Sequence, residues 1–113
     1  MVKEIPESSV NIIPILNQFK ERTERVYGKK LKRIILYGSY ARGMASKDSD
    51  IDLMIVLSEM ESAFSEIERL TEIKFDISLN YDVVISTNPV SEESFLKSGT
   101  PYFKNVAKDG IAI

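Results

Sequence analysis

The sequence predicts an α/β (α+β) protein, with a small mixed sheet of three to four strands and helices packed on it. Apolar residues recur at three- and four-residue steps from about Asn11 to Tyr27 and from Glu59 to about Ser78, which is typical of helices that bury one face. Short apolar runs at Leu31–Tyr37, Ile51–Leu57 and Tyr81–Ser86 have the length of buried strands. Three long strands are too few for a doubly wound fold.

Length and composition agree with one folded domain. The chain has 113 residues, of which 43% are hydrophobic and 28% charged, so we expect residues 1–113 to form a single domain. Cys and His are both absent, which excludes disulfides and leaves carboxylates, hydroxyls, Lys and Arg for any catalysis. The net charge of −2 does not indicate a nucleic-acid surface. Neither a membrane span nor a signal peptide is recognisable, so we expect a cytoplasmic protein.

The first predicted helix follows a short tail over residues 1–8. Asn11 is its expected N-cap, which puts Pro14 in the first turn, where a missing N–H costs little. Gly28 suits its end. The apolar face is predicted to contain Ile12, Ile15, Leu16, Phe19 and Val26.

The segment Ile51–Leu57 is expected to be a central strand. Alternate residues, beginning with Ile51 and Leu53, line one face of it. Met54 and Val56 continue the other face, so both faces are apolar and the strand is expected to be covered on both sides.

The second long helix is predicted to be polar on its far side. Its apolar face is expected to contain Met60, Ala63, Phe64, Ile67, Leu70, Lys74 and Ile77. Its solvated side is expected to contain Glu61, Glu66, Glu68 and Glu72.

The third strand, Tyr81–Ser86, is expected to end at Thr87-Asn88-Pro89. Ser91 could cap a short helix over residues 92–97. Thr100-Pro101 reads as an N-cap followed by a first helical proline, and Gly110 as the end of that last helix. Residues 111–113 are expected to add a small edge strand.

A Gly-Ser pair and an Asp-x-Asp motif carry the chemistry. Gly38-Ser39 follows the first strand, and Asp50 and Asp52 begin the second. Residues i and i+2 of a strand share a face, so the two carboxylates are expected side by side, with their Cα atoms roughly 6.6 Å apart. Their repulsion is relieved by a hard cation such as Mg²⁺. Gly38 allows close approach, Ser39 opens a short helix that offers N–H groups to a phosphate, and Arg42 adds a positive charge.

These residues also carry a family resemblance. The string GSYARGMASKDSDIDL resembles the signature of the nucleotidyltransferase superfamily typified by DNA polymerase beta. Its fuller form is similar to the minimal nucleotidyltransferases, small prokaryotic proteins that are often the antitoxin partner of a HEPN-family toxin. The resemblance implies a polymerase-beta-like core, two Mg²⁺ ions, and transfer of AMP from ATP to a hydroxyl, a tyrosine of the HEPN toxin.

The resemblance also implies a third carboxylate on the strand after the long helix. Asp82 falls near the start of the predicted strand Tyr81–Ser86 and is our candidate. Asp76, in a helical or loop region, is its competitor. The predicted site thus has Asp50, Asp52 and Asp82 as catalytic and metal-binding residues. The predicted nucleotide contacts are Gly38, Ser39 and Arg42.

Several alternatives stay open or are set aside. The chain could be a non-catalytic antitoxin that acts by binding, or a nucleotidyltransferase for a small molecule with a deep pocket beside Asp82. Homo-oligomerisation is left open. An EF-hand reading of Asp48 to Glu59 fails because its sixth position, which needs Gly, is Leu53. A Walker lysine motif is absent.

Overall fold

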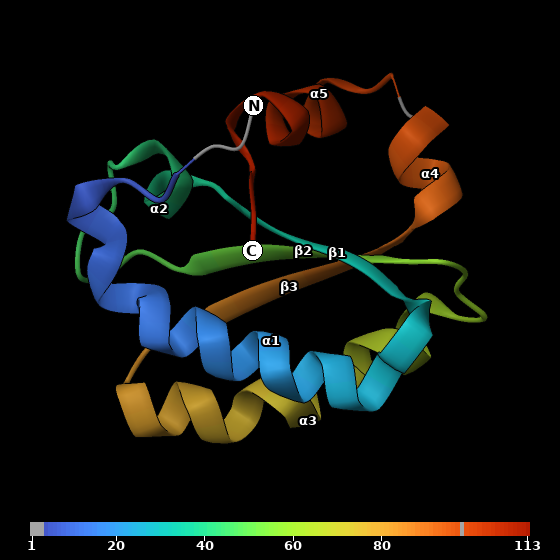
Figure 1. The fold of residues 1–113 in the computed structure, drawn as a ribbon, viewed down its shortest axis with the longest axis horizontal. Helices are drawn as coiled ribbons and strands as arrows, with labels where there is room; N and C mark the ends of the chain where they lie inside the picture. Colours follow the sequence, from blue (N-terminus) through green and yellow to red (C-terminus); the bar gives the residue numbers. More distant parts are fainter. Residues whose placement is uncertain (1–3, 98) are drawn as a thin grey trace.

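The computed structural model describes residues 4–97 and 99–113, and its centre is a four-stranded mixed sheet (Figure 1). The strands are β1 (Leu31–Tyr37), β2 (Ile51–Leu57), β3 (Ile85–Ser91) and β4 (Ile111–Ala112). Their order is β3-β2-β1-β4, with β2 parallel to β3 and antiparallel to β1. The predicted class, a small mixed sheet with helices packed on it, is confirmed.

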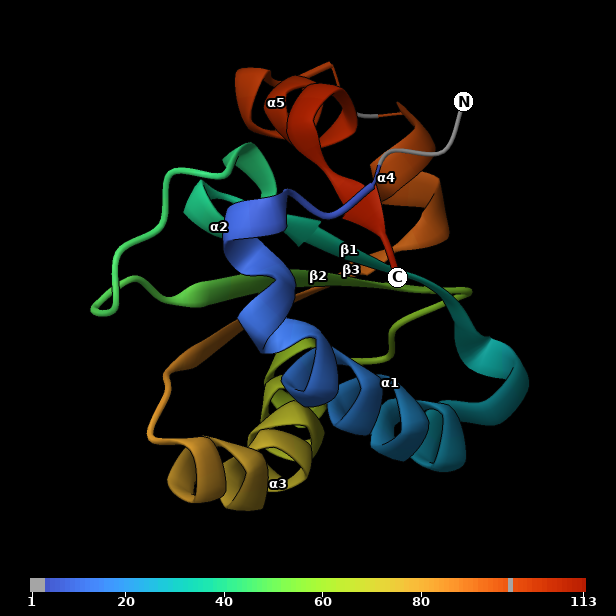
Figure 2. The ribbon, with the colours of Figure 1, turned by 60° about the vertical axis from the view of Figure 1, so that its left-hand side comes forward.

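Helices cover both faces of this sheet, as the two ribbon views show (Figures 1 and 2). The helices α1 and α3 lie side by side on one face, and α4 and α5 cover the other. No helix among the described residues has the length and hydropathy to cross a membrane. The α-helices are α1 (Ile13–Tyr27), α2 (Ser39–Arg42), α3 (Ala63–Tyr81), α4 (Glu92–Lys97) and α5 (Pro101–Asp109). The 3₁₀ helices are η1 (Glu7–Ile12) and η2 (Gly28–Lys30).

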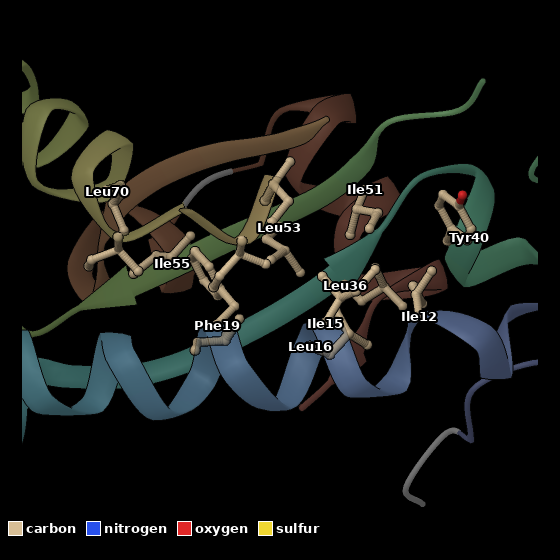
Figure 3. Packing of buried hydrophobic residues seen from close by; sticks show 14 of the residues in the cluster. Ile12, Ile15, Leu16, Phe19, Leu36, Tyr40, Ile51, Leu53, Ile55 and Leu70 are labelled. Atoms are coloured by element: carbon tan, nitrogen blue, oxygen red, sulfur yellow. The ribbon is translucent and has the colours of Figure 1, made fainter. Parts of the chain in front are cut away.

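The central position predicted for Ile51–Leu57 is confirmed. One face of β2 packs into the larger apolar cluster with α1 and α3, which includes Leu53, Phe19 and Leu70 (Figure 3). The other face sends Met54 and Val56 into a smaller cluster under α4 and α5. Adjacent residues of one strand therefore belong to two separate cores, as the two-residue period of a strand requires.

Element ends match the sequence in part. Thr100 caps α5 as predicted, and Gly110 ends it. The Ser91 hydroxyl accepts a hydrogen bond from the Ser94 N–H at 3.1 Å, which agrees with the predicted cap. The expected cap at Asn11 is wrong, because η1 leads directly into α1 and Ile12 is the N-cap. Of the predicted tail, residues 1–3 lie outside the described residues, and Glu7 already begins η1.

The third strand begins and ends later than predicted. It starts at Ile85, and the Thr87-Asn88-Pro89 segment that was expected to end it lies inside it. Proline is tolerated there because β3 is an edge strand, where one side of the backbone needs no ladder partner. This shift matters for the site, because it changes which side chain lies beside Asp52.

The buried face of α3 differs from the predicted one. Phe64 and Ile67, expected in the core, are exposed, while Glu66, expected in solvent, is buried. The Glu66 carboxylate accepts hydrogen bonds from the Tyr27 hydroxyl at 3.2 Å and from Arg69 at 3.0 Å. Burial and the adjacent carboxylate raise the pKa of Tyr27 to about 12. The residues that α3 turns inward are Glu66, Leu70, Ile73 and Ile77.

Candidate active site

The turn after β1 packs closely against the carboxylate of Asp52. Gly38 caps α2 with φ 76°, a conformation that L side chains rarely adopt. A Cβ atom on Gly38 would lie 2.2 Å from Asp52 Oδ2, so only glycine fits. The structure therefore shows Gly38 in close contact with a motif aspartate of the protein itself, whereas the sequence predicts its close approach to a bound phosphate.

The N-terminal segment fixes the Gly-Ser turn from outside. The Ser9 hydroxyl donates to the Tyr40 carbonyl at 2.7 Å in a buried contact, and the Ser8 hydroxyl donates to the Gly43 carbonyl at 3.3 Å. Ser39 opens α2 as predicted, and its carbonyl accepts from the Met44 N–H at 2.9 Å. Sequence reasoning missed Ser8 and Ser9, because a serine pair in a polar tail carries no signal of a distant partner.

Asp50 and Asp52 lie together at the start of β2. Asp52 pairs with Tyr37 of β1 and with Ser86 of β3, and it is half-buried, whereas Asp50 is exposed. Burial and the nearby charge of Asp50 raise the pKa of Asp52, and the charge of Arg42 partly offsets this. The structure thus brings together four of the predicted residues: Gly38, Arg42, Asp50 and Asp52.

A hollow of about 240 Å³ opens between this turn and α5. It is lined by Gly38, Arg42 and Tyr102, among others. The Tyr102 hydroxyl accepts from the Asn88 amide and donates to the Tyr37 hydroxyl at 3.0 Å, which ties α5 to the sheet beside Asp52. The pKa of Tyr37 is raised by burial, by Tyr102 and by Asp52, so its phenol stays protonated.

The placement of Asp82 on the third strand is wrong. The helix α3 continues to Tyr81, and Asp82 is its exposed C-cap in the left-handed conformation, with φ 52° and ψ 51°. The strand β3 contains no acidic residue, and the side chain paired with Asp52 is Ser86. The competitor Asp76 lies on α3 with its carboxylate 3.5 Å from Arg22.

Asp82 nevertheless borders the site. It lines a second hollow of about 520 Å³ with Asp48, Asp50 and Tyr81, where β2 and β3 begin. In the described part of the chain, no three acidic side chains are arranged to hold a metal ion together. The pair Asp50 and Asp52 fits a divalent cation, since a cation would offset the burial and the charge of Asp50, which together raise the pKa of Asp52. Its other ligands would be water or phosphate oxygens.

Comparison with known proteins agrees with this reading of fold and motif. Residues 16–112 match the family model described as the nucleotidyltransferase domain. The chain belongs to this family, and it is a nucleotidyltransferase.

Its relatives include proteins that are named for a particular reaction. "Putative protein adenylyltransferase MJ0141" of Methanocaldococcus jannaschii is 34% identical over 104 residues, which are 92% of this chain and 100% of the relative. "Protein adenylyltransferase MntA" of Thermococcus cleftensis is 32% identical over 85 residues, which are 75% of this chain and 77% of the relative.

Solved structures share the fold. A crystal structure described as a toxin-antitoxin with AMP-PNP has a TM-score of 0.61 at 20% identity and covers 85% of this chain and 69% of its own. A structure from Sulfolobus solfataricus has a TM-score of 0.61 at 17% identity and covers 94% of this chain and 82% of its own.

Proposed function

We propose that this protein transfers AMP from ATP, with Mg²⁺, to a tyrosine hydroxyl of a HEPN-family toxin and thereby acts as an antitoxin in the cytoplasm. The observation that carries the proposal is the carboxylate of Asp52 seated against Gly38, with Asp50 and Arg42 beside it. The relatives named protein adenylyltransferases support the reaction, and MntA and the toxin-antitoxin fold neighbour support the partner.

Each motif residue has a role in this proposal. Gly38 and Ser39 hold the β- and γ-phosphates through the turn and the start of α2, and Arg42 adds charge to that contact. Asp50 and Asp52 hold magnesium, which would neutralise charge on the triphosphate when bound. The acceptor oxygen bonds to the α-phosphorus, the bond from that phosphorus to the bridging oxygen of pyrophosphate breaks, and pyrophosphate leaves.

Asp82 is proposed for the acceptor side. It shares a hollow with Asp50, and that hollow lies where β2 and β3 begin. A carboxylate there could accept the proton that the acceptor hydroxyl loses. This role differs from that of Asp50 and Asp52, because Asp82 stands on a helix cap rather than on the strand.

The decisive experiment uses the protein, ATP, Mg²⁺ and the purified toxin encoded beside it. Intact-mass spectrometry should show the toxin gaining AMP units, and tandem spectra should place them on tyrosine. Asp50→Ala should lose nearly all transfer. Asp76→Ala is the matched control, since its carboxylate pairs with Arg22, and it should transfer normally. Transfer by Asp50→Ala at the wild-type rate would show that the reaction does not take place at the proposed site.

A non-catalytic antitoxin is the second candidate. The absence of an acidic residue from β3, beside Asp52, favours it, because the resemblance implies a carboxylate on that strand. The same experiment separates the two candidates. A tight complex in which the toxin never gains AMP, with wild-type protein and Mg²⁺ present, would establish neutralisation by binding alone.

A further inference from the structure

The outward side of α3 carries a row of large apolar side chains. Phe64, Ile67, Phe75 and Leu79 are 70%, 48%, 59% and 67% exposed. At about 100° per residue these four positions fall on one side of the helix, with Thr71 between them. The opposite side holds the buried Leu70, Ile73 and Ile77. We call the four exposed residues the α3 stripe.

The α3 stripe is large for a surface that only faces water. A phenylalanine side chain presents about 150–250 Å², so Phe64 and Phe75 together expose roughly 200–300 Å² at their fractions. With Ile67 and Leu79 the stripe reaches the range of about 300–600 Å² that marks the largest, often functional, patch of a monomer. A single exposed leucine would need no explanation, but four large apolar side chains exposed on the same side of one helix need one.

One flank of the α3 stripe is acidic and unpaired. Glu68 is exposed between Phe75 and Leu79 around the helix, and Glu72 is exposed beside Leu79. Glu72 also lines a hollow with arginines of α1 and α3, which are Arg22, Arg25 and Arg69. Within the described residues neither carboxylate forms a hydrogen bond or an ion pair. The other acidic residues of α3 are paired, Glu66 with Arg69 and Asp76 with Arg22. The opposite flank has Thr71, Ser78 and the partly buried Lys74, whose ammonium donates a hydrogen bond to the Thr87 hydroxyl at 3.3 Å.

This charge pattern disfavours a second copy of the chain packed antiparallel along α3. Two copies of α3 packed antiparallel about a two-fold axis would place like flanks together, so that Glu68 and Glu72 would face the same carboxylates of the partner copy. Like charges held close across a packed helix pair are unfavourable. A helix with basic residues along one side would instead place a positive charge opposite each free carboxylate.

We propose that the α3 stripe is the docking site for an amphipathic α-helix of a partner protein, one whose apolar face is bordered by Lys or Arg. The 19 residues of α3 form a straight ridge of about 28 Å, enough for several turns of a partner helix. Side chains at helical spacing would pack between the stripe residues, as in other helix-to-helix contacts. The docking does not depend on the transfer reaction.

The position of the α3 stripe suits delivery of an acceptor. The helix α3 lies on the sheet face opposite to α5, so a docked partner leaves the hollow beside Gly38 open. The stripe ends at Leu79, three residues before Asp82, which lines the hollow shared with Asp50. One end of a helix on the stripe therefore comes to the acceptor side of the site. This consequence, unlike the docking itself, rests on the proposed function.

The first test uses two synthetic fluorescent helices of 19 residues with leucine at three- and four-residue steps. One carries lysine on both flanks and the other glutamate at the same positions. Fluorescence anisotropy with the full chain should show the lysine helix binding at least about tenfold more tightly than the glutamate helix. Phe64→Ser with Phe75→Ser should weaken that binding at least about tenfold, as loss of an aromatic anchor does. Glu68→Gln with Glu72→Gln should weaken it less and reduce its salt dependence.

Leu96→Ser is the matched control. Leu96 is 67% exposed, as Leu79 is, but lies on α4 at the other sheet face. This variant should bind the lysine helix as the wild type does. Because all substituted residues are exposed, the variants should keep the wild-type melting temperature, which circular dichroism checks. If the variant pair unfolds, Ile67→Ser with Leu79→Ser replaces it in the same assay.

Three outcomes would overturn the proposal. The two helices could bind equally, the α3 variants could bind as the wild type does, or the wild type could be a dimer that Phe75→Ser makes monomeric in light scattering. Failure of the transfer reaction is read separately. If the proposed function holds, the stripe variants should keep the ATP affinity of the wild type while transfer of AMP to the toxin falls. A wild-type protein that transfers no AMP but still binds the lysine helix would contradict only the proposed function.

Discussion

The two faces of the sheet differ in what they contain: one holds most of the buried apolar core, and the other holds the candidate site. The face under α1 and α3 carries the larger apolar cluster, with Phe19, Leu53 and Leu70 fully buried. The face under α4 and α5 has a smaller cluster around Met54, and it leaves room for the half-buried Asp52. The central strand β2 contributes alternate residues to both faces.

This difference shows how a small domain can hold an unfavourable charge. Burial and Asp50 raise the pKa of Asp52, so the ionised carboxylate weakens the folded state. A domain of this size is only marginally stable. The apolar packing on the α1 and α3 face supplies the stability, and the other face can then keep a charged and partly open site.

The largest expected effect compares adjacent residues of β2. Leu53 and Met54 are both fully buried but on opposite faces. Leu53→Ala should lower the free energy of unfolding by about 3–5 kcal/mol, and Met54→Ala by about 2–3 kcal/mol, because the smaller cluster can collapse around the lost volume. Urea unfolding measures both. An equal or larger loss for Met54→Ala would show that the two faces contribute alike.

The next effect concerns the glycine that admits Asp52. Gly38→Ala should lower the free energy of unfolding by about 1–3 kcal/mol and weaken ATP binding, because the new methyl group displaces the Asp52 carboxylate. Thermal unfolding and calorimetric titration with ATP and Mg²⁺ measure the two changes.

Gly28→Ala is the control for backbone strain alone. Gly28 also has a positive φ, of 54°, but nothing lies within 4 Å of a Cβ atom there. It should therefore lose some stability and keep wild-type ATP affinity. Equal ATP affinity for both alanine variants would mean that the contact between Gly38 and Asp52 is unimportant for binding.

The smallest effect has the opposite sign. Asp52→Asn should raise the melting temperature at pH 7, because it removes a carboxylate whose pKa is raised in the folded state. The pKa of Asp52 is 3.8 in the unfolded chain and higher in the folded protein, so the folded wild type binds the Asp52 proton more tightly. The stability of the wild type therefore falls as pH rises from 3.8 through the folded pKa. Below pH 3.8 the melting temperature of Asp52→Asn should no longer exceed that of the wild type.

Scanning calorimetry from pH 3 to pH 8 follows this gain, and millimolar Mg²⁺ should reduce it by stabilising the wild type. Asp76→Asn, which removes an ion-paired carboxylate, should show no gain. A lower melting temperature for Asp52→Asn at pH 7 would mean that the carboxylate holds the turn more strongly than its repulsion weakens the fold.

Local patterns predicted the fold and much of the site. The alternation of Ile51–Leu57 was enough for a central strand, and the motif spacing was enough to bring Gly38, Asp50 and Asp52 together. Such features depend on residues close in sequence or on one strand pairing. The face of α3 could not be predicted in this way, because both of its sides carry apolar residues at helical spacing.

The sequence by itself determined a mixed sheet, the Gly38-Ser39 turn and the adjacent carboxylates of Asp50 and Asp52. These follow from the period of a strand and from the conformational freedom of glycine, both of which are local. The tertiary structure alone decided that Glu66 turns inward, that Asp82 caps a helix, and that Ser86 lies beside Asp52. Those outcomes depend on how α3 and β3 pack against elements far away in the chain, where total burial outweighs local preference.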